Sequence, residues 1–479
     1  MSTPTCEFDA AVIGSGPNGL CAAVALAQTG RKVVVYEARD TIGGSARTAP
    51  LTLPGFRHDV CSAIHPMAAA SPALSNLPLS EHGLRWIHPD VPLAHPFDDA
   101  PAVLLERTIE ATAATMGDDG PRYARWMAPL LRDWEPLIAD ALGPPGFPSS
   151  PLVMARFGLW AVRPAAMTAR SVFKGERGRG FFAGMAGHAV MPMERAASSA
   201  IGLMLTLAGH AAGWPFPEGG AQAIPDALAS IFTGLGGVIR LDTRITRLED
   251  VETDGPVFFQ TAPAVLARIA GEHLPAGYLR RLARYRHGPG VFKVDWALSE
   301  PIPWRDDACR RAATLHLGST LDEIAASERI AWDGGISPSP YVLLAQHSLF
   351  DPTRAPAGLH TAWGYCHVES GSTVDHTDFI EGQVERYAPG FRDCILARHT
   401  MSAADFEGYS DSFIGGDINV GVPDLDQLLT RPVVRLSPYT TPNPRIFLCS
   451  AATPPGGGVH GMGGMNAVAA MVSAGRMGW

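Results

Sequence analysis

The pattern of apolar positions near the start of the chain predicts a strand, a helix and a second strand in quick succession. Residues 9–13 are a short apolar run with β-branched side chains, residues 20–29 are rich in Ala and Leu, and residues 32–36 are a second apolar run. Gly30 follows the Ala-rich run, at a position where glycine commonly ends a helix. We therefore expect a βαβ unit across residues 8–37.

A glycine-rich turn lies between the first predicted strand and the helix. Gly14, Gly16 and Gly19 form the pattern G-x-G-x-x-G, which gives a tight turn, close backbone approach to a pyrophosphate and close packing of helix on strand. Glu37 follows the second strand, where its carboxylate can accept hydrogen bonds from a ribose. The predicted dinucleotide site consists of Gly14, Ser15, Gly16, Pro17, Asn18, Gly19, Glu37 and Ala38.

Farther along the chain, helical and extended patterns alternate in blocks. Prolines interrupt short predicted strands in 84–105, and apolar residues at three-to-four spacing predict helices in 107–142. A strand–helix rhythm returns between residues 221 and 270. Later patterns predict strands at 291–298, 341–346, 360–367 and 445–452, and helices at 380–387 and 466–477.

These blocks predict an α/β fold in which a Rossmann-type domain is built from discontinuous segments, with a second substrate domain of mixed sheet and helices. The chain leaves the first domain and returns to it twice. The predicted boundaries are 1–105, 216–287 and 425–479 for the cofactor domain, 106–215 for a helical cap of the substrate domain, and 288–424 for its sheet.

Composition excludes several classes of protein. The formal net charge of -9 argues against a nucleic-acid partner. The seven cysteines are scattered without a C-x-x-C pair, which predicts neither a disulfide framework nor a metal site and fits a cytoplasmic protein. We expect no signal peptide and no membrane-spanning segment, because neither pattern occurs in the sequence. A homo-oligomer is compatible with the sequence.

Several further motifs together carry a family resemblance. They include Gly43-Gly44, the segment from Pro54 to Asp59, and the segment from Gly209 to Gly220. Asp351-Pro-x-Arg354, Ala388-Pro-Gly-Phe391 and the glycine-dense loop 455–464 complete the set. Over essentially its whole length the chain resembles the phytoene-desaturase-like FAD oxidoreductases of the amine-oxidase superfamily. Within that superfamily it is most similar to the branch labelled pyridine nucleotide-disulfide oxidoreductase domain proteins.

The resemblance implies that FAD is the cofactor, held by both glycine-rich ends of the chain. Arg47 either neutralises phosphate charge or packs on the surface, and we favour the cofactor role. Two departures from the family pattern stand out: Ser450-Ala-Ala replaces a common Gly-Asp, and residues 250–256 form an unusually short connection. The implied additional cofactor residues are Gly43, Gly44, Ser45, Arg47, Ile245, Gly458, His460, Gly461, Met462 and Asn466.

The implied reaction is hydride removal from a carbon of an apolar, isoprenoid- or carotenoid-like substrate, which leaves a double bond. His65 and His460 are the candidate catalytic residues; His188 and His210 are further candidates, and each of the four is as readily explained as a structural histidine. The glycines at 178–184 have the wrong spacing for a second dinucleotide site. We therefore expect oxygen or a quinone as the electron acceptor.

Three alternatives remain open. One is an amine oxidase, in which Lys293 would hold a water molecule near the flavin. The second is a flavin-dependent isomerase, and the third is an escort-type protein that binds prenylated or lipid partners without catalysis. The apolar, basic stretch 152–204 predicts either peripheral contact with an anionic membrane or a solvated helix face over a substrate cavity.

Overall fold

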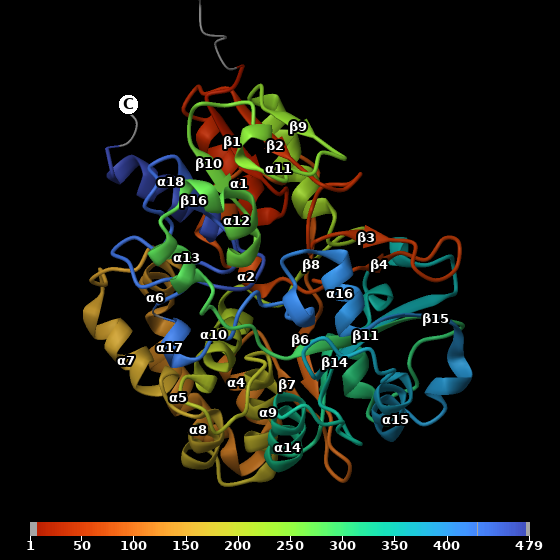
Figure 1. Ribbon diagram of the computed structural model, residues 1–479. Helices are drawn as coiled ribbons and strands as arrows, with labels where there is room; N and C mark the ends of the chain where they lie inside the picture. The colour runs from red at the N-terminus through yellow and green to blue at the C-terminus, as the bar shows by residue number, and fades with distance from the viewer. Residues whose placement is uncertain (1–6, 429, 476–479) are drawn as a thin grey trace, which may run out of the picture.

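The computed structural model describes residues 7–428 and 430–475, and its core begins with a parallel sheet. This sheet has the strand order β16-β10-β1-β2-β9 (Figure 1, top). Four of its strands are fully buried, which explains why they read as unbroken apolar runs rather than as alternating ones. The strands are β1 (Ala10–Ile13), β2 (Val33–Tyr36), β9 (Val238–Arg240), β10 (Val257–Phe259) and β16 (Ile446–Leu448).

Helices cover both faces of the parallel sheet, as expected for a Rossmann-type fold. On one face α1 packs between two helices that are distant in the sequence, α11 and α18. Strands from three separate parts of the chain therefore form one sheet, which agrees with the predicted discontinuous domain. The helices of this domain are α1 (Pro17–Ala27), α11 (Ala223–Gly234), α12 (Pro263–Ala270), α13 (Ala276–Leu282) and α18 (Met462–Ser473). The predicted end of the last helix, Met477, lies outside the described residues.

A second sheet has the order β15-β11-β14-β13-β12-β6-β7 and is antiparallel except where β12 pairs with β6. It incorporates residues 91–105, although the sequence-based boundary at 105 assigns them to the cofactor domain. The topology therefore moves that boundary to a point before β6. The strands are β6 (Val91–His95), β7 (Val103–Leu105), β11 (Gly290–Leu298), β12 (Ala312–Leu317), β13 (Val342–Ala345), β14 (His360–Val368) and β15 (Ile395–Met401).

The two faces of the second sheet have different chemistry. Residues directly opposite each other on neighbouring strands share a face, and the pairing places Thr314, Ala345 and Trp363 in one row. The opposite face carries apolar residues such as Trp296 and Leu344, which pack with α15 (Thr377–Tyr387). The row that contains Trp363 therefore faces the interior between this sheet and the other parts of the molecule.

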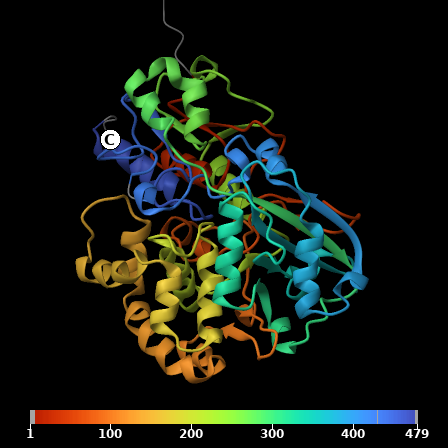
Figure 2. The same ribbon diagram turned by 60° about the horizontal axis from the view of Figure 1, so that its bottom comes forward.

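A helical layer lies beside the second sheet and beneath the parallel sheet (Figure 2). Within it, α9 approaches the sheet closely: a Cβ on Gly180 would lie 2.2 Å from the Ser319 carbonyl oxygen, and one on Gly187 would lie 2.4 Å from the Tyr341 ring. The glycines at 178–184 thus serve helix packing. The helices are α4 (Ile109–Thr115), α5 (Gly120–Arg132), α6 (Trp134–Leu142), α7 (Pro151–Ala161), α8 (Ala165–Val172), α9 (Glu176–Gly187) and α10 (Ser198–Ala211).

The remaining short elements connect these layers. The small sheets pair β3 (Thr48–Ala49) with β4 (His58–Asp59), and β5 (Trp86–Ile87) with β8 (Phe216–Pro217). The sequence patterns located β11, β13, β14 and α15, but they did not predict β12, β15 or α14. The other helices are α2 (Pro66–Ala69), α3 (Pro72–Ser75), α14 (Leu321–Trp332), α16 (Ala403–Tyr409) and α17 (Leu425–Leu428).

A buried ion pair joins the two domains. Arg354, which follows β13, donates to both carboxylate oxygens of Asp59 at the end of β4, at 3.3 and 2.5 Å. Asp59 also accepts from the backbone N–H of Ala221, at 2.8 Å, and Arg354 lies 3.3 Å from Asp351. Burial alone raises the pKa of Asp59, but Arg354 and the other donors hold it well below its usual value. Asp59 ends the motif 54–59, Arg354 ends the motif 351–354, and Ala221 directly follows the motif 209–220. Three motifs that are separate in the sequence therefore meet at this ion pair.

Replacing Arg354 by Leu is expected to lower the free energy of unfolding by about 3–5 kcal/mol, because Asp59 would remain buried without its partner. Denaturant titration at neutral pH measures this loss. Since the pKa of Asp59 is lower in the folded state, the contribution is present at neutral pH and disappears as the pH falls below about 4.

The matched control is Arg170→Leu, which removes an exposed ion pair with Asp322 and should change stability by only about 0–1 kcal/mol. Equal effects of the two substitutions would contradict the role assigned to Asp59 and Arg354.

Candidate cofactor and substrate site

A single large cavity of about 1000 Å³ extends from the glycine turn after β1 to the second sheet. Its first end is lined by the predicted dinucleotide residues. Its other end is lined by apolar and aromatic side chains of the helical layer and the sheet, including Met204, Leu343 and Trp363. The cavity therefore joins a polar cradle in one domain to an apolar chamber between the domains.

Gln260 occupies the centre of the glycine turn. The backbone N–H of Gly16 donates to its Oε1 atom at 2.8 Å, and a Cβ on Gly16 would lie 2.6 Å from the same side-chain amide. Gln260 directly follows β10, so it lies at the carboxyl end of the parallel sheet, where such folds bind ligands. The sequence analysis missed this residue, although its place after a buried strand was a usable signal.

Glu37 is held in a dense set of hydrogen bonds. Its carboxylate accepts from the backbone and hydroxyl of Ser15, at 3.1 and 2.5 Å, and from the backbone of Arg39 at 3.0 Å. It also forms an ion pair with Arg47 at 3.3 Å. Arg47 is buried and donates to the carbonyl oxygens of Thr41 and Ile42, so it braces this loop rather than packing on the surface.

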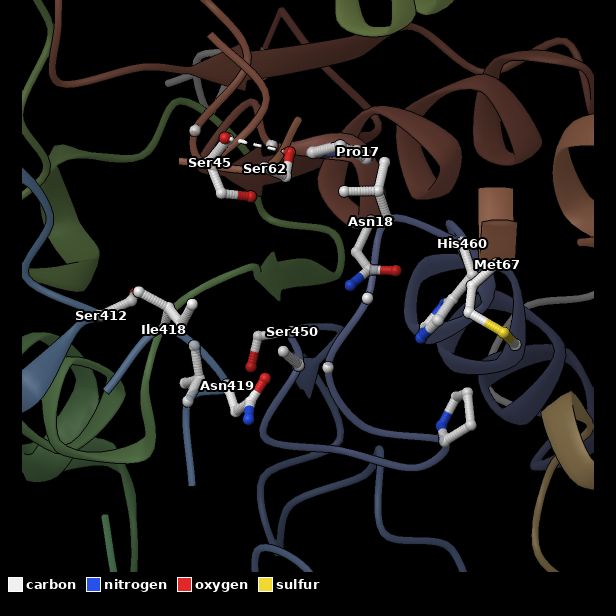
Figure 3. A pocket seen from close by; sticks show the side chains of 18 of the residues that line it. Pro17, Asn18, Ser45, Ser62, Met67, Ser412, Ile418, Asn419, Ser450 and His460 are labelled. Atoms are coloured by element: carbon white, nitrogen blue, oxygen red, sulfur yellow. Dashed lines mark hydrogen bonds between the residues drawn. The ribbon is translucent and has the colours of Figure 1, made fainter. Parts of the chain in front are cut away.

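The loop before α18 closes over the start of α1 (Figure 3). Asn18 accepts from the N–H of Gly463 at 3.1 Å, and a Cβ on Gly464 would lie 1.9 Å from the Asn18 carbonyl oxygen. The two helix N-termini therefore lie close together at the cavity. Asn466 instead donates to the Leu142 carbonyl oxygen at 3.0 Å, which links α18 to the end of α6.

His460 organises this loop from within. Its Nδ1 accepts from the N–H of Met462 at 3.1 Å, and its Nε2 donates to the Gly456 carbonyl oxygen at 3.2 Å. Both ring nitrogens are thus engaged in local bonds, and burial lowers the pKa of His460 to about 4. This geometry leaves no lone pair on His460 for a substrate proton.

His65 lies in the cavity lining just before α2. Its Nε2 lies 3.2 Å from the Ser62 hydroxyl, and its Nδ1 is buried without a hydrogen-bond partner among the described residues. Burial lowers the pKa of His65 to about 4, so the ring is neutral at pH 7 and retains a free lone pair.

The other polar candidates lie in different surroundings. Lys293 is buried and forms an ion pair of 2.6 Å with Asp295, outside the cavity lining. His210 lies 2.5 Å from the Tyr123 hydroxyl, also away from the cavity. His188 does line the cavity, and its Nε2 is 2.9 Å from the Nε2 of His316.

The cavity thus brings together most of the predicted site residues but not all of them. Ser15, Gly19, Gly43, Gly461, Met462 and Asn466 lie behind its surface. Residues that the sequence analysis did not identify also line the dinucleotide end, among them Arg39, Thr243, Tyr409, Asn419 and Arg431. The predicted residues in the lining are Gly14, Gly16, Pro17, Asn18, Glu37, Ala38, Gly44, Ser45, Arg47, His65, Ile245, Gly458 and His460.

Comparison with known proteins adds independent information. The family model described as an NAD(P)-binding Rossmann-like domain matches residues 12–77. Pyridine nucleotide-disulfide oxidoreductase domain-containing protein 2 of Rattus norvegicus is 26% identical, over 96% of this chain and 92% of that protein. Phytoene dehydrogenase of Streptomyces griseus is 29% identical over 73% and 70% of the two chains.

Cyclohexylamine oxidase of Brevibacterium oxydans has a similar structure, with a TM-score of 0.61 and 16% identity over 98% of this chain and 100% of the other. At that identity the likeness concerns the fold alone. The Rossmann-type α/β fold class predicted from the sequence is confirmed, and so is the stated resemblance, because the relatives include both protein groups named for it.

Proposed function

We propose that this chain, an oxidoreductase of the phytoene desaturase and amine oxidase type, binds FAD and removes a hydride from a carbon of an apolar substrate. The observation that carries the proposal is the continuous cavity, which runs from the dinucleotide cradle into an apolar chamber. Met154, Phe157, Met204 and Leu205 supply that chamber from the helical layer. An elongated hydrocarbon would bury its surface there.

The polar end of the cavity is built from the first βαβ unit, from the loop that contains Gly44 and from the loop before α18. Together these segments fit a dinucleotide. Gly44 approaches Gly16 so closely that a Cβ on it would lie 3.2 Å from the Gly16 Cα, which leaves backbone surface for a pyrophosphate. Gly16, Glu37 and Arg47 would hold the adenosine half, and the segment before α18 would hold the remainder. FAD supplies a hydride acceptor beside the chamber when it is bound.

The residues of the chain have separate tasks in this proposal. The apolar chamber orients the substrate and excludes water, because its lining offers few hydrogen-bonding groups. His65 is the candidate proton acceptor, since the residue lines the cavity and its ring is neutral at pH 7. The glycines of α9 pack against the second sheet, so they do not form a second dinucleotide site for NAD. Oxygen or a quinone therefore remains the proposed electron acceptor.

FAD binding is expected to depend on Gly16. Gly16→Ala would place a methyl group against Gln260 and in the path of the pyrophosphate, so FAD affinity should fall roughly tenfold or more, while the flexible Gln260 side chain limits the effect on folding. Flavin absorbance of the purified protein and the bound fraction of FAD measure this change.

Gly382→Ala is the control, because the space around a Cβ at Gly382 is open. A wild-type protein that takes up no flavin after addition of FAD would contradict the proposed cofactor and favour the escort-type lipid-binding alternative.

The substrate class can be tested by mixing the flavin-loaded protein anaerobically with a polyene hydrocarbon or with a long-chain amine. We expect the polyene to bleach the flavin absorbance and the amine to leave it unchanged. The reason is that Lys293 is engaged by Asp295 and lies outside the cavity lining. Bleaching by amines alone would replace the desaturase proposal by the amine oxidase alternative.

We also propose that the protein collects its substrate at a membrane surface through α7. Leu152, Leu159 and Val162 on and beside this helix are 83%, 64% and 50% exposed, and Phe147 in the preceding loop is 90% exposed. The same segment lines the cavity with its other side, through Phe157. An apolar surface beside the cavity mouth would give a membrane-dissolved substrate a short path inward.

Electrostatic attraction is a smaller part of this contact than the basic sequence suggested. Arg156 pairs with Asp133, and Arg170 pairs with Asp322. Arg163 instead stacks on the exposed side of the segment, with its guanidinium 4.5 Å from the centre of the Trp160 ring. No helix in the described part of the chain is long and apolar enough to cross a bilayer.

Leu152→Ser combined with Leu159→Ser should reduce co-sedimentation with anionic phospholipid vesicles by at least about tenfold, because each buried leucine contributes about 1.5–3 kcal/mol. Leu436→Ser removes an even more exposed leucine elsewhere and should have no effect. Unchanged sedimentation of the double variant would rule out docking through α7.

A further inference from the structure

His188 stands out as a polar group in the apolar chamber. It follows the last residue of α9 and contributes to the cavity lining beside Trp214, whose ring centre is 5.7 Å from that of His188. Its Nε2 is held by His316, but its Nδ1 has no hydrogen-bond partner among the described residues. His188 is partly exposed as a residue, whereas His65, His316 and His460 are buried.

His316 determines which ring nitrogen of His188 carries the proton. The two Nε2 atoms are 2.9 Å apart, so one of them must donate to the other. The Nδ1 of His316 is buried without a partner, and a proton there would be a buried N–H group without an acceptor. His316 therefore carries its proton on Nε2 and donates to His188, which leaves the His188 proton on Nδ1.

The packing of α9 holds this arrangement in place. A Cβ on Gly184 would lie 3.0 Å from the Nδ1 of His316, so the absence of a side chain lets the helix approach the sheet. The Nε2 of His95 donates to the Ser319 carbonyl oxygen at 2.7 Å, and no hydrogen bond joins the Nδ1 of His95 to that of His316. Helix and sheet thus hold the His188 ring in the cavity lining.

The charge around His188 selects the kind of ligand. Burial lowers the pKa of His188 to about 3, so the ring is neutral at pH 7. The described lining contains three acidic residues, Glu37, Asp140 and Asp411, and none of them lies on the second sheet. The lining also contains five arginines, and none of these lies on the second sheet either: Arg39, Arg47, Arg244, Arg268 and Arg431. The strands that face His188 therefore offer neither a carboxylate to an ammonium group nor a cation to a carboxylate.

We propose that the Nδ1–H of His188 binds a neutral oxygen, such as a carbonyl or hydroxyl oxygen, on an otherwise apolar substrate. The proposal deepens the proposed function, on which it rests, by adding one polar group to the expected hydrocarbon. His188 is then a specificity-determining residue, and His316 positions it by fixing the proton. A substrate that lacks the oxygen leaves the N–H of His188 unpaired in an apolar chamber.

A matched pair of ligands tests this assignment: a long-chain methyl ketone and the alkene of the same chain length. Equilibrium dialysis of each labelled compound against the flavin-loaded protein should show about three- to tenfold tighter binding of the ketone, as one neutral hydrogen bond provides. The measurement needs no turnover, so its failure is separate from a failure of either compound to bleach the flavin.

Two substitutions of His188 separate its two nitrogens. His188→Gln places an amide near Nε2, which keeps the contact with His316 and removes the donor in the cavity, so the preference for the ketone should disappear. His188→Asn places an amide near Nδ1 and should retain much of the preference. His88→Leu, at an exposed histidine outside the cavity lining, should leave both affinities unchanged.

Equal binding of ketone and alkene to the wild type would overturn the proposal, as would a preference that survives in His188→Gln. Failure of both compounds to bind would overturn it as well, because the chamber would then not accept apolar chains. Thermal unfolding of each variant shows whether it is folded, and His188→Asn provides a positive result that a merely structural histidine would not give.

Discussion

The buried ion pair between Asp59 and Arg354 connects two domains whose sheets share no strand. Asp59 belongs to the cofactor domain and Arg354 to the substrate domain, and the backbone of Ala221 joins them as the chain re-enters the cofactor domain. A charge pair with almost no exposed surface tolerates little displacement, because each partner would lose its compensation. The cavity is lined by residues of both domains, so the pair helps to hold its two sides together.

Local sequence signals located the glycine turn and its βαβ unit, because each of their determinants lies within a short stretch. The turn from Gly14 to Gly19 needs glycines for reasons that act over a few residues, and the strand and helix on either side of it are visible in the apolar pattern. By contrast, β12 and β15 were missed. In β12, Thr314 and His316 alternate with two leucines, but this alternation covers only four residues, and the strand is buried on both faces.

The remaining features depend on contacts between distant parts of the chain. Gln260 reaches Gly16 across 244 positions, and His188 meets His316 across 128. Neither pair has a signature in the sequence around it. The glycines illustrate the same point. Both Gly16 and Gly184 belong to glycine-rich stretches of the sequence, but Gly16 lies at the proposed ligand site, whereas Gly184 allows a helix to approach a sheet. Only the neighbours supplied by the fold distinguish the two uses.

The ionisable groups near the chamber are arranged to keep it uncharged. Lys293 and Asp295 neutralise each other at 2.6 Å, and the histidines that line the cavity are neutral because burial lowers their pKa values. None of the charged side chains in the described lining lies on the second sheet. A neutral chamber neither attracts an ammonium group nor solvates a carboxylate, so discrimination among substrates must come from shape and from single hydrogen bonds. In the proposed function, this division would place the cofactor at the polar end of the cavity and leave the apolar end to bind the substrate.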